Sequence, residues 1–252
     1  MFIIKNDEQI ALMKIAGRIT AEALMVAKEM IRPGISTKEI DTKIRRYIEK
    51  CGATPSFLGY GGFPGSACIS INEQVIHGIP SDRVVLSEGD IVKVDVGARY
   101  RGYNGDSART FAVGKVSDEA LKLISVTEAS FYEAMKVAKA GNRVGDIGSA
   151  VESFVISNGF SVVRDFVGHG VGKDLHEEPE IPNFGRAGRG ARLYSGMTLA
   201  VEPMVNAGTH DVRVLKDGWT VVTSDGKLSA HYENSILITD NDPIILTDVD
   251  VR

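Results

Sequence analysis

Cysteine is scarce in this sequence, with Cys51 and Cys68 as the whole complement of its 252 residues. A pair at this length does not indicate the disulfide framework of a small secreted domain. We expect both to be buried as small apolar side chains in a reducing compartment. The apolar run at residues 2–4 is too short for a signal peptide, and the acidic residues Asp7 and Glu8 follow it. These features predict a cytoplasmic protein.

An excess of positive charge and a long apolar run are also missing. Lys and Arg number 29 against 33 Asp and Glu, a formal net charge of −4, so no basic surface is expected for a nucleic-acid backbone. No apolar run approaches the length of a membrane span. Hydrophobic residues make up 43% of the chain, which is ordinary for a globular protein with a sizeable core. We therefore expect one domain over residues 1–252, with no nucleic-acid or membrane partner.

Helix and strand signals alternate along the chain. Asn6 and Gln9 form a capping pattern before a long helix, and Ser36 and Glu39 form a capping box before a shorter helix that Gly52 ends. The expected elements are helices over residues 7 to about 31, 36–52, 117–140 and about 146–157, with strands within residues 54–113 and 160–246. This order predicts an α+β fold.

The order of two helices followed by strands occurs twice. An offset of 107 residues superimposes the helix-entry turn, the apolar face of the second helix and the glycine after it. The matched pairs are Gly34 and Gly141, Glu39 and Asp146, Ile40 and Ile147, Ile44 and Val151, Tyr47 and Phe154, Ile48 and Val155, and Gly52 and Gly159. Amphipathic helices share a period, so chance similarity is the alternative. The shared glycines favour a repeat, with halves near residues 1–115 and 116–252 and a cleft between them.

Two acidic residues are expected on one β-hairpin. Residues 91–96 alternate like a strand, with Asp95 on the face opposite to the valines, and a second strand begins at Asp106. A turn at Tyr100 and Arg101 would place Asp95 directly opposite Asp106, and a turn shifted by one position would make them diagonal neighbours. Carboxylates that close repel each other unless a cation lies between them. The alternative is two solvated acids.

Three more candidate ligands follow in the second half. His169 lies in a glycine-rich segment, Gly168-His169-Gly170-Val171-Gly172, which permits close approach of a ligand. Glu202 and Glu233 flank apolar strands, where an unpaired charge would be costly to bury. Taken singly, each is better explained as a loop histidine or as a strand-end acid that reaches water. Together with the hairpin acids they form a set of four carboxylates and one imidazole, which suits two divalent ions such as Mn, Fe, Co or Zn that activate water.

At this point the chain resembles the type I methionine aminopeptidases, which have the pita-bread fold. The resemblance covers essentially the whole chain, and a pseudo-twofold fold agrees with the repeat. The motifs that carry it are Asn72-Glu73-Gln74-Val75-Ile76-His77-Gly78-Ile79-Pro80, Val94-Asp95-Val96-Gly97, Gly105-Asp106-Ser107-Ala108-Arg109-Thr110, Gly168-His169-Gly170-Val171-Gly172, Leu175-His176-Glu177-Glu178-Pro179 and Glu202-Pro203-Met204.

The resemblance implies a role for each ligand. Asp95 would bind one metal ion, Asp106 and Glu233 would bridge both ions, and His169 with Glu202 would complete the second site. Glu202 would also act as the general base and acid on the attacking water.

The resemblance also implies residues that bind the substrate. His77 would contact the scissile amide, and His176 would stabilise the tetrahedral oxyanion, unless both are structural histidines. The positions that match a pocket for the methionine side chain are Phe57, Tyr60, Phe63, Cys68 and Trp219. Positions that match a monovalent-cation site in relatives are the backbone carbonyls of Asn72 and Gln74, with Ser229.

The implied activity is removal of the initiator methionine from nascent proteins and peptides when the second residue is small, by a monomeric enzyme near the ribosome. One departure is visible: Asn234-Ser235 stands where relatives usually have His-Thr after the last Glu. One rival hypothesis is an Xaa-Pro aminopeptidase or dipeptidase on the same fold. Another is a non-catalytic pita-bread module that binds peptides.

Overall fold

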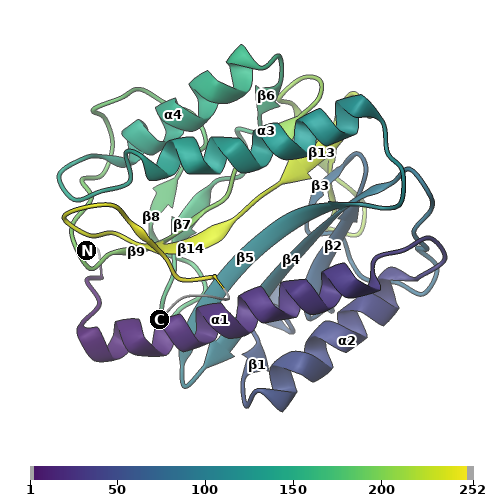
Figure 1. Cartoon of the computed structure of the whole chain (residues 1–252), viewed down its shortest axis with the longest axis horizontal. Coiled ribbons are helices and arrows are strands. Elements are labelled where there is room, and N and C mark those ends of the chain that lie inside the picture. The colour runs from purple at the N-terminus through teal and green to yellow at the C-terminus, as the bar shows by residue number, and fades with distance from the viewer. Residues whose placement is uncertain (1–2, 249–252) are drawn as a thin grey trace.

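A computed structural model describes residues 3–248 of the chain, and its first half contains two helices and all four strands of one sheet (Figure 1). Its elements are α1 (Asp7–Met30), α2 (Thr37–Lys50), β1 (Thr54–Pro55), the short 3-10 helix η1 (Tyr60–Gly62), β2 (Ala67–Ile71), β3 (Gln74–Ile76), β4 (Ile91–Tyr100) and β5 (Tyr103–Ala112). Strand β4 is central, because β5 pairs along one edge while β1 and β2 pair along the other, all antiparallel.

The second half repeats the order of helices before strands. Its elements are α3 (Asp118–Met135), α4 (Val144–Ser157), β6 (Ser161–Val162), β7 (Gly168–Gly170), β8 (Glu177–Ile181), β9 (Thr198–Val201), β10 (Met204–Asn206), β11 (Val212–Val214), β12 (Val221–Thr223), β13 (Ser229–His231), β14 (Asn234–Leu237) and β15 (Ile244–Ile245). Five of these strands form the antiparallel sheet β15-β14-β9-β7-β8.

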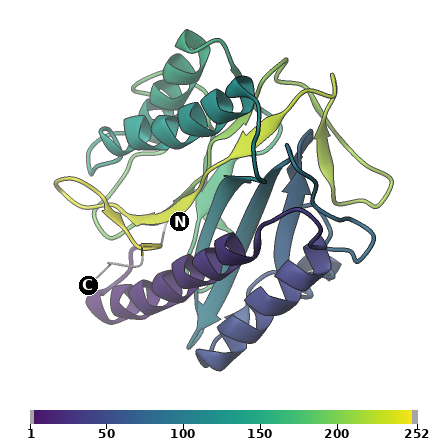
Figure 2. The same cartoon turned by 45° about the vertical axis from the view of Figure 1, so that its right-hand side comes forward.

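The helices of each half cover their own part of the sheets. Helices α1 and α2 lie together below the β4–β5 hairpin, and α3 and α4 lie together above the strands of the second half (Figures 1 and 2). Each helix pair covers a separate apolar cluster, one containing Ile40, Ile44 and Ile48, the other Ile147 and Val151. This arrangement is the α+β pita-bread fold, which confirms the predicted fold class.

Local capping chemistry explains where the first two helices begin. The Asn6 side chain accepts a hydrogen bond from the Gln9 N–H, and the Gln9 side chain accepts one from the Asn6 N–H, both at 2.9 Å. Ser36 and Glu39 form the same reciprocal box before α2. Each box satisfies backbone donors that have no partner inside the helix.

The loops around α2 and α4 use the same backbone hydrogen bonds at an offset of 107 residues. The matched bonds are Gly34 N–H to Leu86 C=O and Gly141 N–H to Leu193 C=O, then Thr37 N–H to Val84 C=O and Val144 N–H to Ala191 C=O. The glycines before the helices share a left-handed backbone, with φ of 89° at Gly34 and 96° at Gly141. Glycine adopts this conformation without steric cost, which explains its presence at both positions.

Three boundaries differ from the sequence prediction. The hairpin turn is at Arg101 and Gly102, one position later than Tyr100 and Arg101, because both central residues take positive φ and Gly suits the second place. Helix α3 ends at Met135 rather than at residue 140. Beyond it, the Ala140 N–H bonds the Thr239 carbonyl and leaves the helical path. Helix α4 begins at residue 144 instead of about 146.

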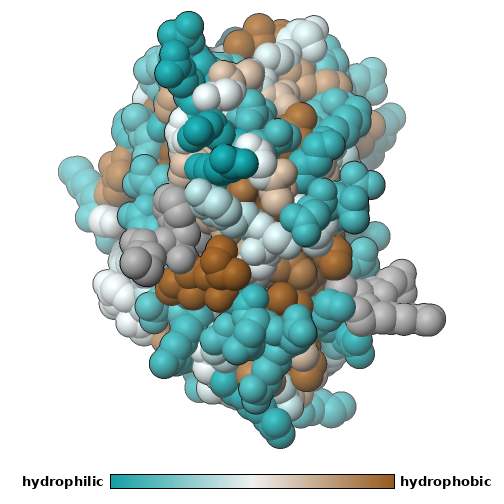
Figure 3. Space-filling model, turned by 90° about the vertical axis from the view of Figure 1, so that its left-hand side faces the viewer, coloured by the Kyte–Doolittle hydropathy of each residue, from teal (hydrophilic) through white to brown (hydrophobic). Residues whose placement is uncertain are grey.

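The surface is mixed in character. Figure 3 shows one face on which hydrophilic side chains predominate and apolar ones gather in a small area near the middle. Within residues 3–248, none of the helices combines the length and apolar character that a membrane crossing requires.

Candidate metal and substrate site

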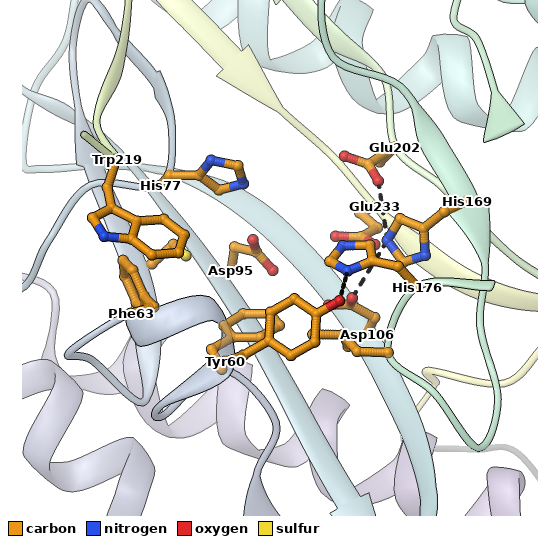
Figure 4. A pocket seen from close by; sticks show the side chains of 13 residues that line it. Tyr60, Phe63, His77, Asp95, Asp106, His169, His176, Glu202, Trp219 and Glu233 are labelled. Atoms are coloured by element: carbon orange, nitrogen blue, oxygen red, sulfur yellow. Dashed lines mark hydrogen bonds and ion pairs between the residues drawn. The ribbon is translucent and has the colours of Figure 1, made fainter. Parts of the chain in front are cut away.

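The β4–β5 hairpin supplies the first two carboxylates. Asp95 pairs with Ala108, and Asp106 pairs with Gly97, so the two acids are diagonal neighbours on one face, as the shifted-turn alternative predicts. On the other edge of β4, Asp95 pairs with Cys68. Both acids point into the cavity that is drawn in Figure 4.

His169 faces these acids from β7, on the other half of the molecule. Its Nδ1 lies 2.9 Å from the Gly170 carbonyl oxygen, which only accepts hydrogen bonds, so Nδ1 carries the proton. The free Nε2 then points at the acids, 3.8 Å from Asp106 Oδ2 and 3.5 Å from Glu202 Oε1 (Figure 4). A histidine held in this tautomer presents a lone pair to a metal ion.

Glu202 and Glu233 complete the acidic group. Glu202 follows β9, and the Asn183 side chain donates a hydrogen bond to its backbone carbonyl at 2.9 Å. Glu233 lies between β13 and β14 and exchanges two backbone hydrogen bonds with Ala108 of β5, at 2.9 and 3.3 Å. These two bonds join the halves of the molecule directly beside the site.

The residues after Glu233 anchor its strand to the hairpin. The Ser235 hydroxyl accepts a hydrogen bond from the Asp106 N–H and donates one to the Asp106 carbonyl, both at 2.9 Å. The Asn234 side chain points to the opposite face, where its oxygen accepts from Arg109 at 2.8 Å and from Thr247 at 2.9 Å. Asn234 and Ser235, the pair that differs from the usual His-Thr implied by the resemblance, therefore do not lie among the candidate ligands.

The buried acids have little counter-charge around them, because the Arg109 guanidinium lowers the pKa of Glu233 but does not offset the effect of burial. Burial raises the pKa of Asp95, Glu202 and Glu233 well above their ordinary values, and it raises the pKa of Asp106 to about 7. One buried oxygen each of Asp95, Asp106 and Glu233 has no hydrogen-bond partner within residues 3–248. Ligand atoms of Asp106, His169 and Glu233 lie within 4.8 Å of one another. Orphaned anionic oxygens around a free imidazole nitrogen fit divalent metal ions.

The other end of the cavity is apolar. All five side chains expected for a methionine pocket, which are Phe57, Tyr60, Phe63, Cys68 and Trp219, line the same cavity as the acids. The rings of Phe63 and Trp219 meet edge to face, with their centroids 5.2 Å apart. In Figure 4 these two residues lie at one end, His169 and Glu202 at the other, and Asp95 between them.

Two further histidines lie along this cavity. His77 is within ring contact of Trp219, at 6.4 Å between centroids, and burial lowers its pKa to about 4. His176 lies beside His169, 4.2 Å between ring centroids, with its Nδ1 2.7 Å from the Tyr60 hydroxyl. Because Tyr60 can donate to Nδ1, the other nitrogen of His176 is left to carry a proton toward a ligand.

Comparison with known proteins agrees with this geometry. Residues 11–240 match the family described as "Metallopeptidase family M24". The methionine aminopeptidase of Clostridium acetobutylicum is 54% identical over 247 residues, 98% of this chain and 99% of that protein. The chain belongs to the M24 metallopeptidase family. The crystal structure of methionine aminopeptidase from Thermotoga maritima superimposes at a TM-score of 0.97 with 46% identity, covering 98% of this chain and 100% of that one.

Solved structures of peptidases with other names share the fold more distantly. Prolidase from Pyrococcus furiosus superimposes at a TM-score of 0.80 with 26% identity, and the match covers 98% of this chain and 65% of the prolidase. The match to methionine aminopeptidases is therefore better in identity, in superposition and in the share of the other chain that is covered.

The backbone carbonyl of Asn72, one of the positions that match a monovalent-cation site, accepts hydrogen bonds from two groups of the protein. The buried Lys93 amino group donates to it at 2.7 Å, and the Ser229 N–H donates to it at 3.1 Å. Burial lowers the pKa of Lys93 to about 7. The residues of the implied monovalent-cation site thus fit an ion poorly, because the Lys93 amino group already bonds a carbonyl that the ion would need as a ligand.

The sequence interpretation gave no role to two residues of the site. Leu175 lines the apolar part of the cavity, and its position beside His176 in the chain could have indicated this. His231 lies beside the acids, with Nε2 3.7 Å from Glu202 Oε2. Its place two residues before Glu233 on an extended segment puts both on one face, which was the available signal.

Proposed function

We propose that this M24 peptidase removes the initiator methionine from nascent proteins and peptides whose second residue is small. The observation that carries the proposal is a single cavity in which a buried acid–histidine cluster faces an apolar pocket. The apolar end suits an unbranched thioether side chain, and the acidic end suits metal ions and a free α-amino group.

The five candidate ligands would hold two divalent ions, which we propose to be Co, Mn, Fe or Zn. These ligands are Asp95, Asp106, His169, Glu202 and Glu233. Asp95 would hold one ion and His169 with Glu202 the other, while Asp106 and Glu233 bridge. Such ions, when bound, polarise the substrate carbonyl and make water acidic enough to attack it near neutral pH.

The side chains of this chain would perform the proton transfers. Glu202 would accept a proton from the attacking water as the carbon–oxygen bond forms, then deliver it to the leaving nitrogen as the amide bond breaks. His176, oriented by Tyr60, would donate a hydrogen bond to the carbonyl oxygen as negative charge develops there. His77 would contact the scissile amide from the pocket end of the cavity.

The whole described chain would act as one catalytic domain. We propose that residues 1–252 form two related halves, near 1–115 and 116–252. Asp95 and Asp106 come from the first, and His169, Glu202 and Glu233 come from the second. The backbone bonds between Ala108 and Glu233 support this reading, since they join the halves at the site itself. We propose a cytoplasmic monomer that meets its substrates as they leave the ribosome.

We propose further that the Lys93 amino group, rather than a monovalent ion, occupies the Asn72 carbonyl. The 2.7 Å hydrogen bond between them supports this assignment.

A peptidase assay with added Mn²⁺ or Co²⁺ tests the function. Met-Gly-X peptides should be cleaved, and Glu202→Gln should lose this activity while it keeps the fold. Cleavage of X-Pro peptides in place of Met-Gly-X would contradict the assignment and favour the Xaa-Pro reading. A protein that binds peptide but stays inert with every metal would instead be a binding module, and full activity of Glu202→Gln would contradict the role of Glu202.

A further inference from the structure

His231 is a buried polar side chain that the reaction described above does not use. It is 2% exposed, and neither ring nitrogen has a hydrogen-bond partner within the described part of the chain. A buried donor or acceptor without a partner is costly, so its presence requires an explanation.

The local strand geometry aims this ring at the site. Tyr232 packs on the helix side, where its ring contacts Phe131 and the Arg109 guanidinium. Successive side chains of an extended segment point to opposite faces, so His231 and Glu233 share the side that faces the acids. The measured separation agrees, with His231 Nε2 4.0 Å from Glu233 Oε2.

The carboxylate of Glu202 lies between two imidazoles. Its Oε1 is 3.5 Å from His169 Nε2, and its Oε2 is 3.7 Å from His231 Nε2. His169 uses its own Nδ1–H on the Gly170 carbonyl, so it offers a lone pair rather than a proton. His231 has no such fixed partner, and a proton on its Nε2 would point at Glu202. Hydrogen bonds of this kind are often long without substrate and tighten when it binds.

His231 approaches the acids from the side of the two glutamates. Its Nε2 lies 3.7 Å from Glu202 Oε2 and 4.0 Å from Glu233 Oε2, whereas His169 Nε2 lies 3.5 Å from Glu202 Oε1. The two imidazoles therefore approach different oxygens of Glu202.

We propose that His231 is a positioning residue that donates a hydrogen bond to Glu202 Oε2 and thereby orients the carboxylate for proton transfer. This inference rests on the proposed role of Glu202 as base. Held at Oε2 by His231, the carboxylate keeps Oε1 toward His169 and the metal end. Without that bond it is free to rotate away from the water that it must deprotonate.

Two substitutions separate this role from packing. His231→Leu keeps volume but removes the donor, whereas His231→Gln keeps an N–H that can reach Oε2. With Met-Gly-X and saturating Mn²⁺, His231→Leu should lower kcat by about 10- to 100-fold, as expected when a group that orients a ligand or base is lost. KM, the affinity for Mn²⁺ measured by calorimetry and the melting temperature should stay near wild type, and His231→Gln should recover most of kcat.

Two controls complete the design. His210→Leu makes the same substitution at a histidine that is half exposed beside Asp211, and it should change nothing. In the Glu202→Gln background, His231→Leu should have no further effect on residual activity, because two groups that act as a unit are not additive.

The outcomes are distinguishable. Unchanged kcat in His231→Leu would overturn the inference, as would equal losses in the Leu and Gln variants or a loss that excess Mn²⁺ restores. An additive loss in the Glu202→Gln background would overturn it too. Full activity of the single Glu202→Gln variant would instead contradict the proposed role of Glu202 as base. That outcome is distinguished from a failure of the His231 inference because it does not involve a substitution of His231.

Discussion

The two ends of the cavity are built by opposite means. At the metal end, one buried oxygen each of Asp95, Asp106 and Glu233 has no hydrogen-bond partner in the part of the chain that the structure describes, and burial raises the pKa of each of these acids. At the substrate end, the rings of Phe63 and Trp219 pack against each other edge to face. One end is therefore destabilising until a ligand arrives, and the other is part of a packed apolar cluster.

The scaffold explains how the protein tolerates the first end. The acids at the metal end have a well-bonded backbone, although oxygens of their side chains lack partners in the described chain. The bonds between Ala108 and Glu233 and the Ser235 hydroxyl on Asp106 hold this backbone in place. Substitutions at the metal end should thus remove activity at little cost in stability. Substitutions at the apolar end should change substrate affinity, and those in the anchoring bonds should change stability first.

The largest effect is expected from Asp106→Asn. Divalent ions contribute several kcal/mol to such reactions, and about 1.4 kcal/mol corresponds to a factor of ten, so activity should fall by at least about 1,000-fold. Without metal, the variant should melt at the wild-type temperature or above, because one of several mutually repelling buried acids is removed. Peptide assays with Mn²⁺ and calorimetry in EDTA measure both.

Asp82→Asn is the matched control, since Asp82 is an exposed turn residue and is not among the residues that line the acidic cavity. A metal-free Asp106→Asn protein that melts well below wild type would show that the acid stabilises the fold, against the contrast drawn above.

At the apolar end, Trp219→Ala should raise KM for Met-Gly-X with little change in kcat. Losing part of an apolar wall removes about 1.5 kcal/mol of side-chain burial, which corresponds to about a tenfold weaker affinity. Trp219→Phe should keep most of the affinity, because it retains an aromatic edge against Phe63. Steady-state kinetics decides this prediction, and a fall in kcat with unchanged KM would move Trp219 out of the pocket.

How far the sequence predicts this contrast depends on the range of each interaction. The caps at Asn6 and Ser36 were predicted because the interacting residues are three positions apart. The hairpin turn was placed one residue too early, although Gly102 favours the positive φ that such turns need. The end of α3 was predicted too late because a distant carbonyl, that of Thr239, draws the chain away.

The site shows the same limit. Composition and spacing nominate acids and histidines, and the family resemblance assigns them roles. Sequence alone does not show that His231 reaches Glu202, since the contact joins residues 29 positions apart through strand packing. It also does not show that Lys93 bonds the Asn72 carbonyl, because that depends on a side chain of β4 reaching the turn between β2 and β3.

An effect of similar size, but on stability and not on substrate affinity, is expected at the anchor of Asp106. Ser235→Ala leaves the buried Asp106 N–H without its partner, so the free energy of unfolding should fall by about 1–3 kcal/mol. Ser235→Thr keeps the hydroxyl and should stay near wild type. Urea denaturation measures the difference. A stability loss in Ser235→Ala no larger than in Ser235→Thr would show that the two hydrogen bonds do not hold the strand.

The smallest effect is expected from monovalent salts. If the Lys93 amino group occupies the Asn72 carbonyl, the wild-type protein should melt at the same temperature in potassium chloride and in choline chloride of equal ionic strength, because an ion that does not bind shifts no stability. Lys93→Met frees the carbonyl and should make the melting temperature rise with potassium. A wild-type protein that potassium stabilises more than choline does would show that the site holds an ion beside Lys93. The molecule would then have a second region whose stability depends on a ligand, besides the metal end of the cavity.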